Sequence, residues 1–531
     1  MGCKQSRTAP VHVQVRQAPA AAGGPSRPKC AREGCNFARH TDQPHGFCCN
    51  ACRINGQHGP LCQKHTWPIA PPPDDRFKLR WHPSLLFGKG ATGMKDFADL
   101  TATETMHIVA HKGELFASFG KWMSPDFQKR PCKNFVGRLS SSDGHWEVDM
   151  RCQGASEHAV RVTCLKSITW TRDCRGNELS PAVEQLTACY GLGAHGNIIM
   201  FRDDNDQNAP GTQYKWSETN YTGKITDPTP SESARAVIVH RDAVTGIDRI
   251  FALHGVRGAL SGHYDPGSKT PGQVVWDKDP EKLDLSAVKG GATKLEFRPL
   301  AFVSANGKLY MSAASLILQR VDGHNPVWKV VTDIAKFRSD GKFHEAVGGI
   351  RGLTAVPCPS NPKQDSILCC WNPNSQSHSW ILRMDPSDDG NLKPPVEESS
   401  IRKLARAYLG TEDLHYSIGA YNDMLPTTFG TQRCHLIGFQ IVLGGSAMGA
   451  GPDPGQKHYW AGGGFAVRVA HDDYYVLEVG GRGSKSHRPL TAVRCYANSP
   501  FKDEAGTVYF GGYDCNSFPS NNTAWIYKGI A

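Results

Sequence analysis

Cysteine and histidine side chains are concentrated between residues 30 and 65, which read CAREGCNFARHTDQPHGFCCNACRINGQHGPLCQKH. A segment of this length buries too little apolar surface to fold unaided. Thiolate and imidazole ligands that hold Zn²⁺ tetrahedrally supply on the order of 10 kcal/mol of folding free energy. The spacing therefore predicts a structural zinc module, and its candidate ligands are Cys30, Cys35, Cys48, Cys49, Cys52, His58 and Cys62.

The candidate ligands are compatible with either one or two zinc ions. One site would use Cys30, Cys35, Cys52 and either Cys48 or Cys49, while His58 and Cys62 would replace two of these or form a second site with His40, His45 or His65. The alternatives are reduced cysteines in a disordered tail and a redox role for the adjacent Cys48 and Cys49. The second half, FCCNAC followed by HGPLC, resembles the end of MYND-type fingers, and the whole module is similar to Cys/His modules of algal proteins.

The N-terminus, MGCKQSRT, has the residue order that N-myristoylation requires, with Gly2 exposed after removal of Met1 and Cys3 available for palmitate. One myristoyl chain binds membranes only marginally, so a second signal is needed, and Cys3 and the basic residues before Glu33 provide it. The opening resembles that of the dual-acylated Src-type kinases. It predicts a protein held by acyl chains at the cytoplasmic face of a membrane, with a soluble cytoplasmic pool.

Composition excludes several classes of protein. No run of about 18 apolar residues could span a bilayer, and the N-terminus lacks the apolar core of a secretory signal peptide. The net charge of +10 is spread over 531 residues with many acids among them, which argues against a nucleic-acid groove. The expected partners are a membrane surface and an unidentified protein or small ligand at one face of the large C-terminal domain.

From residue 104 onward, short β-rich apolar runs alternate with Gly, Asp, Asn and Pro clusters, so we predict an all-β domain over residues 104–531. Before it we place an acylated, disordered basic tail (1–29), the zinc module (30–65) and a Pro-rich linker and lead-in (66–103). A helical pattern at 399–408 is the one exception. The predicted strands are 107–110, 115–118, 161–165, 198–201, 236–240, 250–253, 300–303, 309–312, 367–371, 435–442, 465–469, 475–479, 490–496 and 508–511.

Degenerate repeats indicate the architecture. The segments RIFALHG, KLYMSAA and SILCCWN align at Ile250, Leu309 and Ile367, and ELFASFG and TVYFGGY are similar. Each precedes a tryptophan: Trp146, Trp276, Trp328, Trp380 and Trp525. A unit of about 50 residues is the size of a four-stranded propeller blade, which predicts a β-propeller of six or seven blades.

Two hairpins, SSDGHW (141–146) and RVDGHNPVW (320–328), place Asp-Gly in a tight turn and tryptophan on the returning strand. They resemble the degenerate Asp-box repeats of sialidase-like propellers, and the C-terminal segment from Ala492 resembles the closing blade of uncharacterised propeller proteins. In that family the Asp-box is structural. The arginine cluster, nucleophilic tyrosine with its glutamate, and acid that a sialidase uses cannot be placed from the sequence.

Two classes of function remain. The first is an interaction or ligand-binding platform at a membrane, and the second is a propeller hydrolase or lyase, acting on glycans or esters, with its site in the central channel. Two carboxylates or three histidines that converge in the channel would favour the enzyme, and neutral lining would favour binding. The candidate residues near strand ends are His254, His263, Asp322, His324, His378, His435, His471, Asp472, Asp473 and Asp514.

Overall fold

The protein was analysed as a computed structural model of residues 1–531. The structure describes residues 77–87, 93, 100–121, 134–152, 161–191, 196–204, 216–223, 234–288, 298–337, 349–373, 378–409, 414–420, 424–429, 431–443, 463–481, 490, 492–513 and 523–531. Gly2, Cys3 and all seven predicted zinc ligands lie outside the described residues, and so does Asp514.

The described residues form five sheets, of which four have four or five strands. The first is β6 (Cys164–Arg172), β7 (Glu178–Gly191), β8 (Asn197–Arg202) and β9 (Trp216–Asn220). The next is β10 (Val237–Arg241), β11 (Asp248–Leu253), β12 (Ala259–Tyr264) and β13 (Val274–Trp276). The third is β15 (Pro299–Ala305), β16 (Lys308–Ala313), β17 (Leu316–Val321) and β18 (Val327–Asp333), with β14 (Lys282–Asp284) added parallel to β18. The fourth is β19 (Gly349–Cys358), β20 (Asn361–Asn372), β21 (Trp380–Met384) and β22 (Val396–Ser400).

The fifth sheet has 13 strands and consists of three antiparallel groups. One is β2 (Glu104–His111), β3 (Glu114–Gly120), β4 (Phe135–Leu139) and β5 (Glu147–Arg151). A second is β23 (Leu414–Gly419), β24 (Leu425–Phe429), β25 (Gln432–Leu443), β26 (Gly464–Ala470) and β27 (Asp473–Glu478). The third is β28 (Ala492–Asn498), β29 (Thr507–Tyr513), β30 (Trp525–Ile530) and β1 (Arg80–Leu86). Single residue pairs, Glu104 with Tyr513 and Gln440 with Ala492, join the groups.

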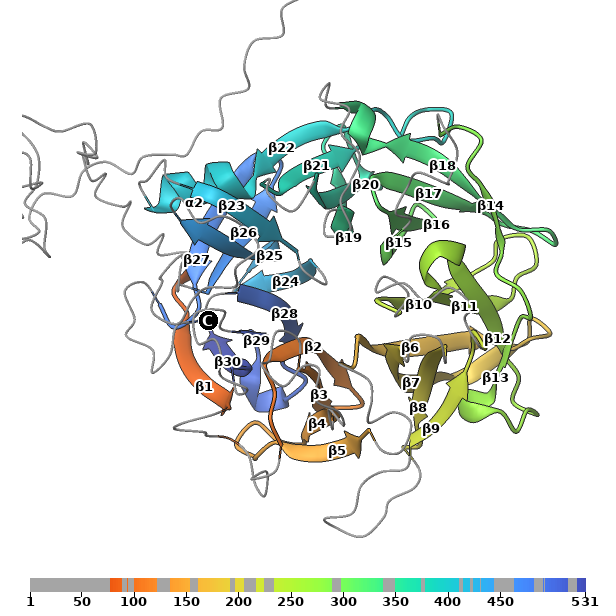
Figure 1. Ribbon diagram of the computed structural model, residues 1–531, viewed down its shortest axis with the longest axis horizontal. Coiled ribbons are helices and arrows are strands. Elements are labelled where there is room, and N and C mark those ends of the chain that lie inside the picture. The colour runs from red at the N-terminus through yellow and green to blue at the C-terminus, as the bar shows by residue number, and fades with distance from the viewer. Residues whose placement is uncertain are drawn as a thin grey trace, which may run out of the picture.

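The sheets stand around a common axis, so the domain is a β-propeller (Figure 1). From the innermost strands β2, β6, β10, β15, β19 and β28 the strands run outward in chain order, and β14 and β1 are added at the outer edges of their groups (Figure 1). The ring is closed by β1, which pairs antiparallel with the C-terminal strand β30. This strand lies in the stretch 66–103, so the propeller takes its closing strand from the segment in front of residue 104.

Helices are few in the described part of the chain. The α-helix α2 (Ile401–Leu409) matches the helical pattern predicted at 399–408, and it packs Ile401, Leu404 and Ala405 into the core. The short 3₁₀ turns are η4 (Gly255–Arg257), η5 (Pro271–Gln273), η7 (Ile334–Phe337) and η8 (Lys502–Glu504). No helix within the described ranges is long and apolar enough to cross a membrane.

The repeat alignment is confirmed by the strand order. The segments aligned at Ile250, Leu309 and Ile367 form β11, β16 and β20, and each is the second strand of its sheet. Both Asp-Gly hairpins join a third strand to a fourth, β4 to β5 and β17 to β18, and Gly323 has a φ of 142°, a value that favours glycine. The apolar part of each of these second strands is buried because it is covered on both faces.

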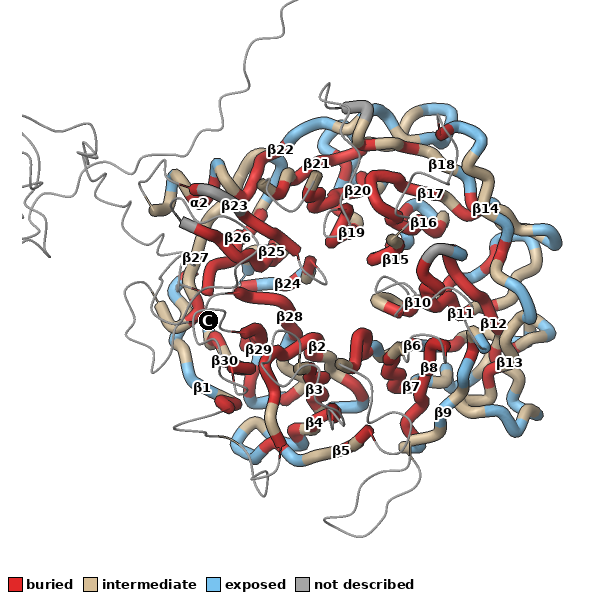
Figure 2. The backbone as a smooth tube through the Cα atoms, in the orientation of Figure 1, coloured by how far each residue is buried: buried red, intermediate tan, exposed pale blue. Residues whose placement is uncertain are grey.

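The core lies between neighbouring sheets, where the middle strands are buried (Figure 2). Trp146, Trp328 and Trp525 are fully buried there, as the repeats predict, whereas Trp276 and Trp380 are only partly buried. Trp328 packs edge-on against Phe251 of the preceding sheet, with ring centroids 6.0 Å apart. Aromatic rings thus link consecutive sheets.

Candidate functional site

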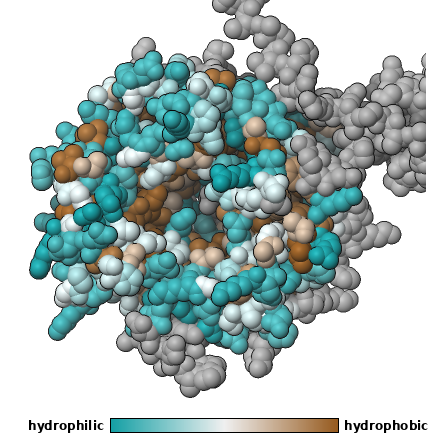
Figure 3. Space-filling model, turned by 180° about the vertical axis from the view of Figure 1, so that it is seen from behind, coloured by the Kyte–Doolittle hydropathy of each residue, from teal (hydrophilic) through white to brown (hydrophobic). Residues whose placement is uncertain are grey.

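Arginines occupy equivalent places on the innermost strands of successive sheets. Arg161 stands three residues before β6, Arg235 two residues before β10, and Arg298 immediately before β15. Arg351 and Arg494 are the third residues of β19 and β28. Glu104, the first residue of β2, holds the corresponding place on that strand. Because all these strands start from the same end of the ring, the residues lie at one end of the central channel. The channel is visible as a hollow in the view from behind (Figure 3).

Arg235 lies within the electrostatic field of this cluster. Burial lowers the pKa of Arg235, the positive charges of Arg161, Arg298 and Arg494 lower it further, and Glu104 opposes them. Arg494 belongs to β28, on the other side of the central opening from β10 (Figure 1). Charges from sheets on both sides of the central opening therefore act on Arg235.

The negative charge of this cluster is paired, whereas one of its positive charges is not. Glu104 is buried, and Arg161 Nη1 donates to its Oε1 over 3.2 Å while Arg494 Nη1 donates to its Oε2. Arg235, by contrast, makes no hydrogen bond or ion pair with the described residues, and its buried Nε has no partner. A guanidinium remains protonated in proteins, so Arg235 is a half-buried, uncompensated cation among other cations.

His107 of β2 adds a neutral group to the cluster. Burial lowers its pKa to about 3, and Arg494, Lys166 and Arg235 contribute to this, whereas a hydrogen bond to the Thr163 carbonyl opposes it. At pH 7 its Nε2–H donates to the Thr163 oxygen over 2.9 Å, which leaves Nδ1 as an acceptor. The cluster therefore combines a fixed positive field, which favours an anion, with one neutral acceptor that can take a hydrogen bond from a hydroxyl group.

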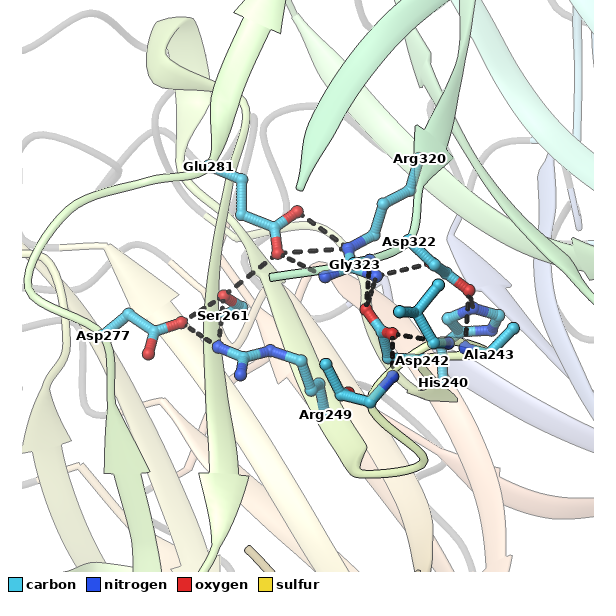
Figure 4. Close-up of polar contacts among 12 residues, drawn as sticks. His240, Asp242, Ala243, Arg249, Ser261, Asp277, Glu281, Arg320, Asp322 and Gly323 are labelled. Carbon is cyan, nitrogen blue, oxygen red and sulfur yellow. Dashed lines mark hydrogen bonds and ion pairs between the residues drawn. The ribbon is translucent and has the colours of Figure 1, made fainter. Parts of the chain in front are cut away.

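A second class of buried charges lies between sheets and is fully paired. Figure 4 shows the guanidinium of Arg320, in β17, paired with the carboxylates of Glu281 (2.8 Å), Asp242 (2.7 Å) and Asp322 (2.5 Å); we call these residues the Arg320 network. Arg202 of β8 binds Asp149 of β5 in the same way, and Arg468 of β26 binds Glu398 of β22. Arg202 and Arg468 sit on the third strand of one sheet and reach a carboxylate on the fourth strand of the preceding sheet. Arg320 reaches Asp242 in the β10–β11 hairpin of the preceding sheet and Glu281 just before β14. We call these pairs the clamp, because they hold neighbouring sheets together. Their charged groups already have partners within the protein and are not available to a ligand.

The residues predicted from strand ends do not converge. Asp322 belongs to the Arg320 network, His324 is exposed, and His378 Nδ1 contacts Ser417. His254 and His263 lie in or beside β12, far around the ring from β25, where His435 is buried and its pKa is lowered to about 4 by burial. His471 and Asp472 come together, 3.0 Å apart, beside Asp473 and near Glu398. No group of three or more metal-ligating side chains occurs among the described residues.

The arginine cluster was missed at the level of sequence, although a signal was present. Aligned on the second strands, the units carry AVRVTC, SARAVI, EFRPLA, GIRGLT and TAVRCY, in which arginine precedes or begins the first apolar strand. A comparison of equivalent positions across units, rather than a search for Asp and His near strand ends, would have found it. Among the described residues no three histidine, cysteine or carboxylate side chains come together as a metal site, whereas arginines recur at the start of five innermost strands.

No family model matches the chain, and no curated protein matches it. Similar solved structures include AofleA from Arthrobotrys oligospora, with 10% identity, a TM-score of 0.35, and coverage of 76% of this chain and 90% of that one. The sialidase of Trypanosoma rangeli shows 10% identity and a TM-score of 0.35 over 86% of this chain and 59% of that one. An α-L-arabinofuranosidase from Fusarium graminearum shows 10% identity and a TM-score of 0.35 over 84% and 96%. At this identity and TM-score the likeness carries no information on ligand or reaction.

Proposed function

We propose that the protein is a ligand-binding propeller whose central channel takes a small molecule with an anionic oxygen group, a carboxylate or a phosphate. The single observation that carries this proposal is Arg235, whose buried Nε has no hydrogen-bond partner and whose guanidinium lies in the positive field of Arg161, Arg298 and Arg494. Leaving a charged group without a partner costs stability, and a bound anion removes that cost. We also infer that the propeller has seven blades, with β24 to β27 as the sixth and β1 closing the seventh.

The proposal predicts opposite effects of Arg235→Gln on the free and the bound protein. The variant should unfold at a higher denaturant concentration in chloride buffer, by about 1–3 kcal/mol, because an unpaired charge is removed. It should also lose most of the stabilisation that an anion gives the wild type, which at ten times Kd amounts to about 1.4 kcal/mol. Thermal and urea unfolding with inorganic phosphate, acetate or D-glucuronate at matched ionic strength measures both effects, and the three anions distinguish phosphate from carboxylate recognition.

Arg175→Gln is the matched control, since Arg175 is exposed in the turn between β6 and β7. It should change neither the stability in chloride nor the response to anions. Equal responses of the wild type and Arg235→Gln to every anion would refute the channel site. A less stable Arg235→Gln would show that Arg235 has a structural partner.

For the N-terminal region we propose that acyl chains on Gly2 and Cys3 hold the propeller at the cytoplasmic face of a membrane, with a soluble cytoplasmic pool, and that the module at 30–65 binds structural Zn²⁺. The spacing of the thiols and the order of the first residues support this. Gly2→Ala should move the chain from the membrane fraction to the soluble fraction without changing its zinc content. An unchanged distribution would contradict anchoring, and zinc below one equivalent per chain would contradict the module.

A further inference from the structure

A serine, a histidine and an aspartate are joined by hydrogen bonds between the first two sheets of the propeller. Ser167 Oγ lies 2.8 Å from His111 Nδ1, and His111 Nε2 lies 3.0 Å from Asp204 Oδ2. The three come from different segments: the end of β2, the middle of β6 and the residues just after β8. The His111 side chain is completely buried, while Ser167 is partly exposed. The order hydroxyl, imidazole, carboxylate is that of a nucleophile, its base and the group that orients the base.

The direction of each hydrogen bond follows from the chemistry of the groups. Burial by itself would raise the pKa of Asp204, but hydrogen bonds from His111, Lys112 and Arg202 hold it well below its ordinary value. The ionised carboxylate can only accept, so His111 donates from Nε2–H. In the neutral imidazole, His111 Nδ1 is then the acceptor for the hydroxyl hydrogen of Ser167. Asp204 thus selects the tautomer whose Nδ1 can take the serine proton.

An internal comparison separates this arrangement from the clamp that surrounds it. The network around Arg320 repeats the arginine and the aspartate two residues later, and His240 Nε2 lies 3.4 Å from Asp322 Oδ2 (Figure 4). Within the described residues that aspartate is the one hydrogen-bond partner of His240. The Arg320 network thus forms without a serine hydroxyl bonded to its histidine. The contact of Ser167 with His111 is therefore not needed to hold the sheets together.

We propose that Ser167, with His111 as general base and Asp204 as its positioning carboxylate, is an acyl-accepting nucleophile for carboxylic esters. Ser167 Oγ would attack the ester carbonyl carbon while its proton passes to His111 Nδ1. The carbon–oxygen bond to the alcohol would then break, with the alcohol taking that proton, and water would release the acid from the acyl-serine by the same route. Asp204 stays ionised and stabilises the imidazolium.

This site is separate from the anion site. Ser167 lies six residues beyond Arg161, and a strand advances about 3.3 Å per residue, so the two sites are roughly 20 Å apart along the direction of β6. The β2–β3 turn that carries His111 is at the opposite end of β2 from Glu104. Failure of one proposal therefore leaves the other untouched.

The test is covalent labelling of the full chain with an aryl fluorophosphonate, followed by mapping of the labelled peptide. We expect the adduct on Ser167, with labelling at least about 100-fold slower in His111→Gln and absent from that peptide in Ser167→Ala. Asp204→Asn should slow labelling, and p-nitrophenyl acetate should acetylate the same serine.

Two controls match the variants. His240→Gln alters the equivalent clamp without a serine, and Ser304→Ala removes an exposed serine from β15; both should label at the wild-type rate. Labelling that is absent from the wild type, or located on another residue, overturns the proposal, and this readout holds even where a variant fails to fold. An equal rate in His111→Gln and wild type also overturns it, since the histidine would then have only a structural role.

Discussion

Removal of residues 1–87 should abolish folding of the propeller, whereas removal of residues 1–75 should leave it intact. The longer deletion takes away β1, which pairs with β30 along its whole length and closes the ring. Leu85 and Leu86 are buried in two different clusters, the first shared with β2 to β5 and the second with β25 to β27. Trp81 packs against Phe510 with ring centroids 5.1 Å apart.

The size of the effect follows from the buried area. Each fully buried leucine or phenylalanine contributes about 1.5–3 kcal/mol, so Leu85, Leu86 and Phe87 together approach the 5–15 kcal/mol that stabilises a typical domain. The unpaired edge of β30 would add a site for aggregation.

Circular dichroism and limited proteolysis of the two truncated chains measure the difference. A synthetic peptide of residues 76–88, added during refolding, should rescue the longer deletion, and a peptide with Leu85→Asp and Leu86→Asp should not. A propeller that melts at the same temperature with and without β1 would show that the ring closes by other contacts.

Arg320→Met should destabilise the protein by about 3–5 kcal/mol, the usual cost of removing one partner from a buried ion pair. The Arg320 side chain is 1% exposed, and so is Asp242, so the variant leaves the carboxylates of Asp242 and Glu281 buried without their cation. Urea unfolding measures the loss. Arg175→Met, in an exposed turn, is the control and should change the free energy of unfolding by less than about 0.5 kcal/mol.

A second set of variants neutralises the carboxylates that Arg320→Met leaves buried without a cation. Asp242→Asn and Glu281→Gln, added to Arg320→Met, should recover part of the lost stability, because neutral amides are cheaper to bury than anions. If the triple variant is less stable than Arg320→Met alone, hydrogen bonds rather than charge dominate the network.

Acid should weaken the same clamp. Burial by itself would raise the pKa of Asp242, but hydrogen bonds from the Thr245 and Gly323 backbone and from Arg320 hold it well below its ordinary value. Its contribution is therefore complete above about pH 4 and is lost as the pH falls below that.

Local patterns in the sequence were enough to predict the all-β class of the fold and its repeat. The second strands each contain a buried apolar run, and these runs align at Ile250, Leu309 and Ile367. The Asp-Gly turns are local features, because the turn type is set by the two residues that form it. Both turns were predicted from the sequence. The zinc ligands and the acylation signal are equally local, and they stay predictions.

Only the tertiary structure decided which charges meet. Arg235 and Arg494 are 259 residues apart in the sequence, and they share a field because the ring brings their strands to one axis. Closure by β1 joins the segment before residue 87 to the C-terminus, a pairing that no local pattern encodes. His111, Ser167 and Asp204 likewise depend on the packing of one sheet against the next. Side-chain periodicity reveals which face of a strand is buried, but the partner across a sheet interface depends on the order and twist of all the sheets.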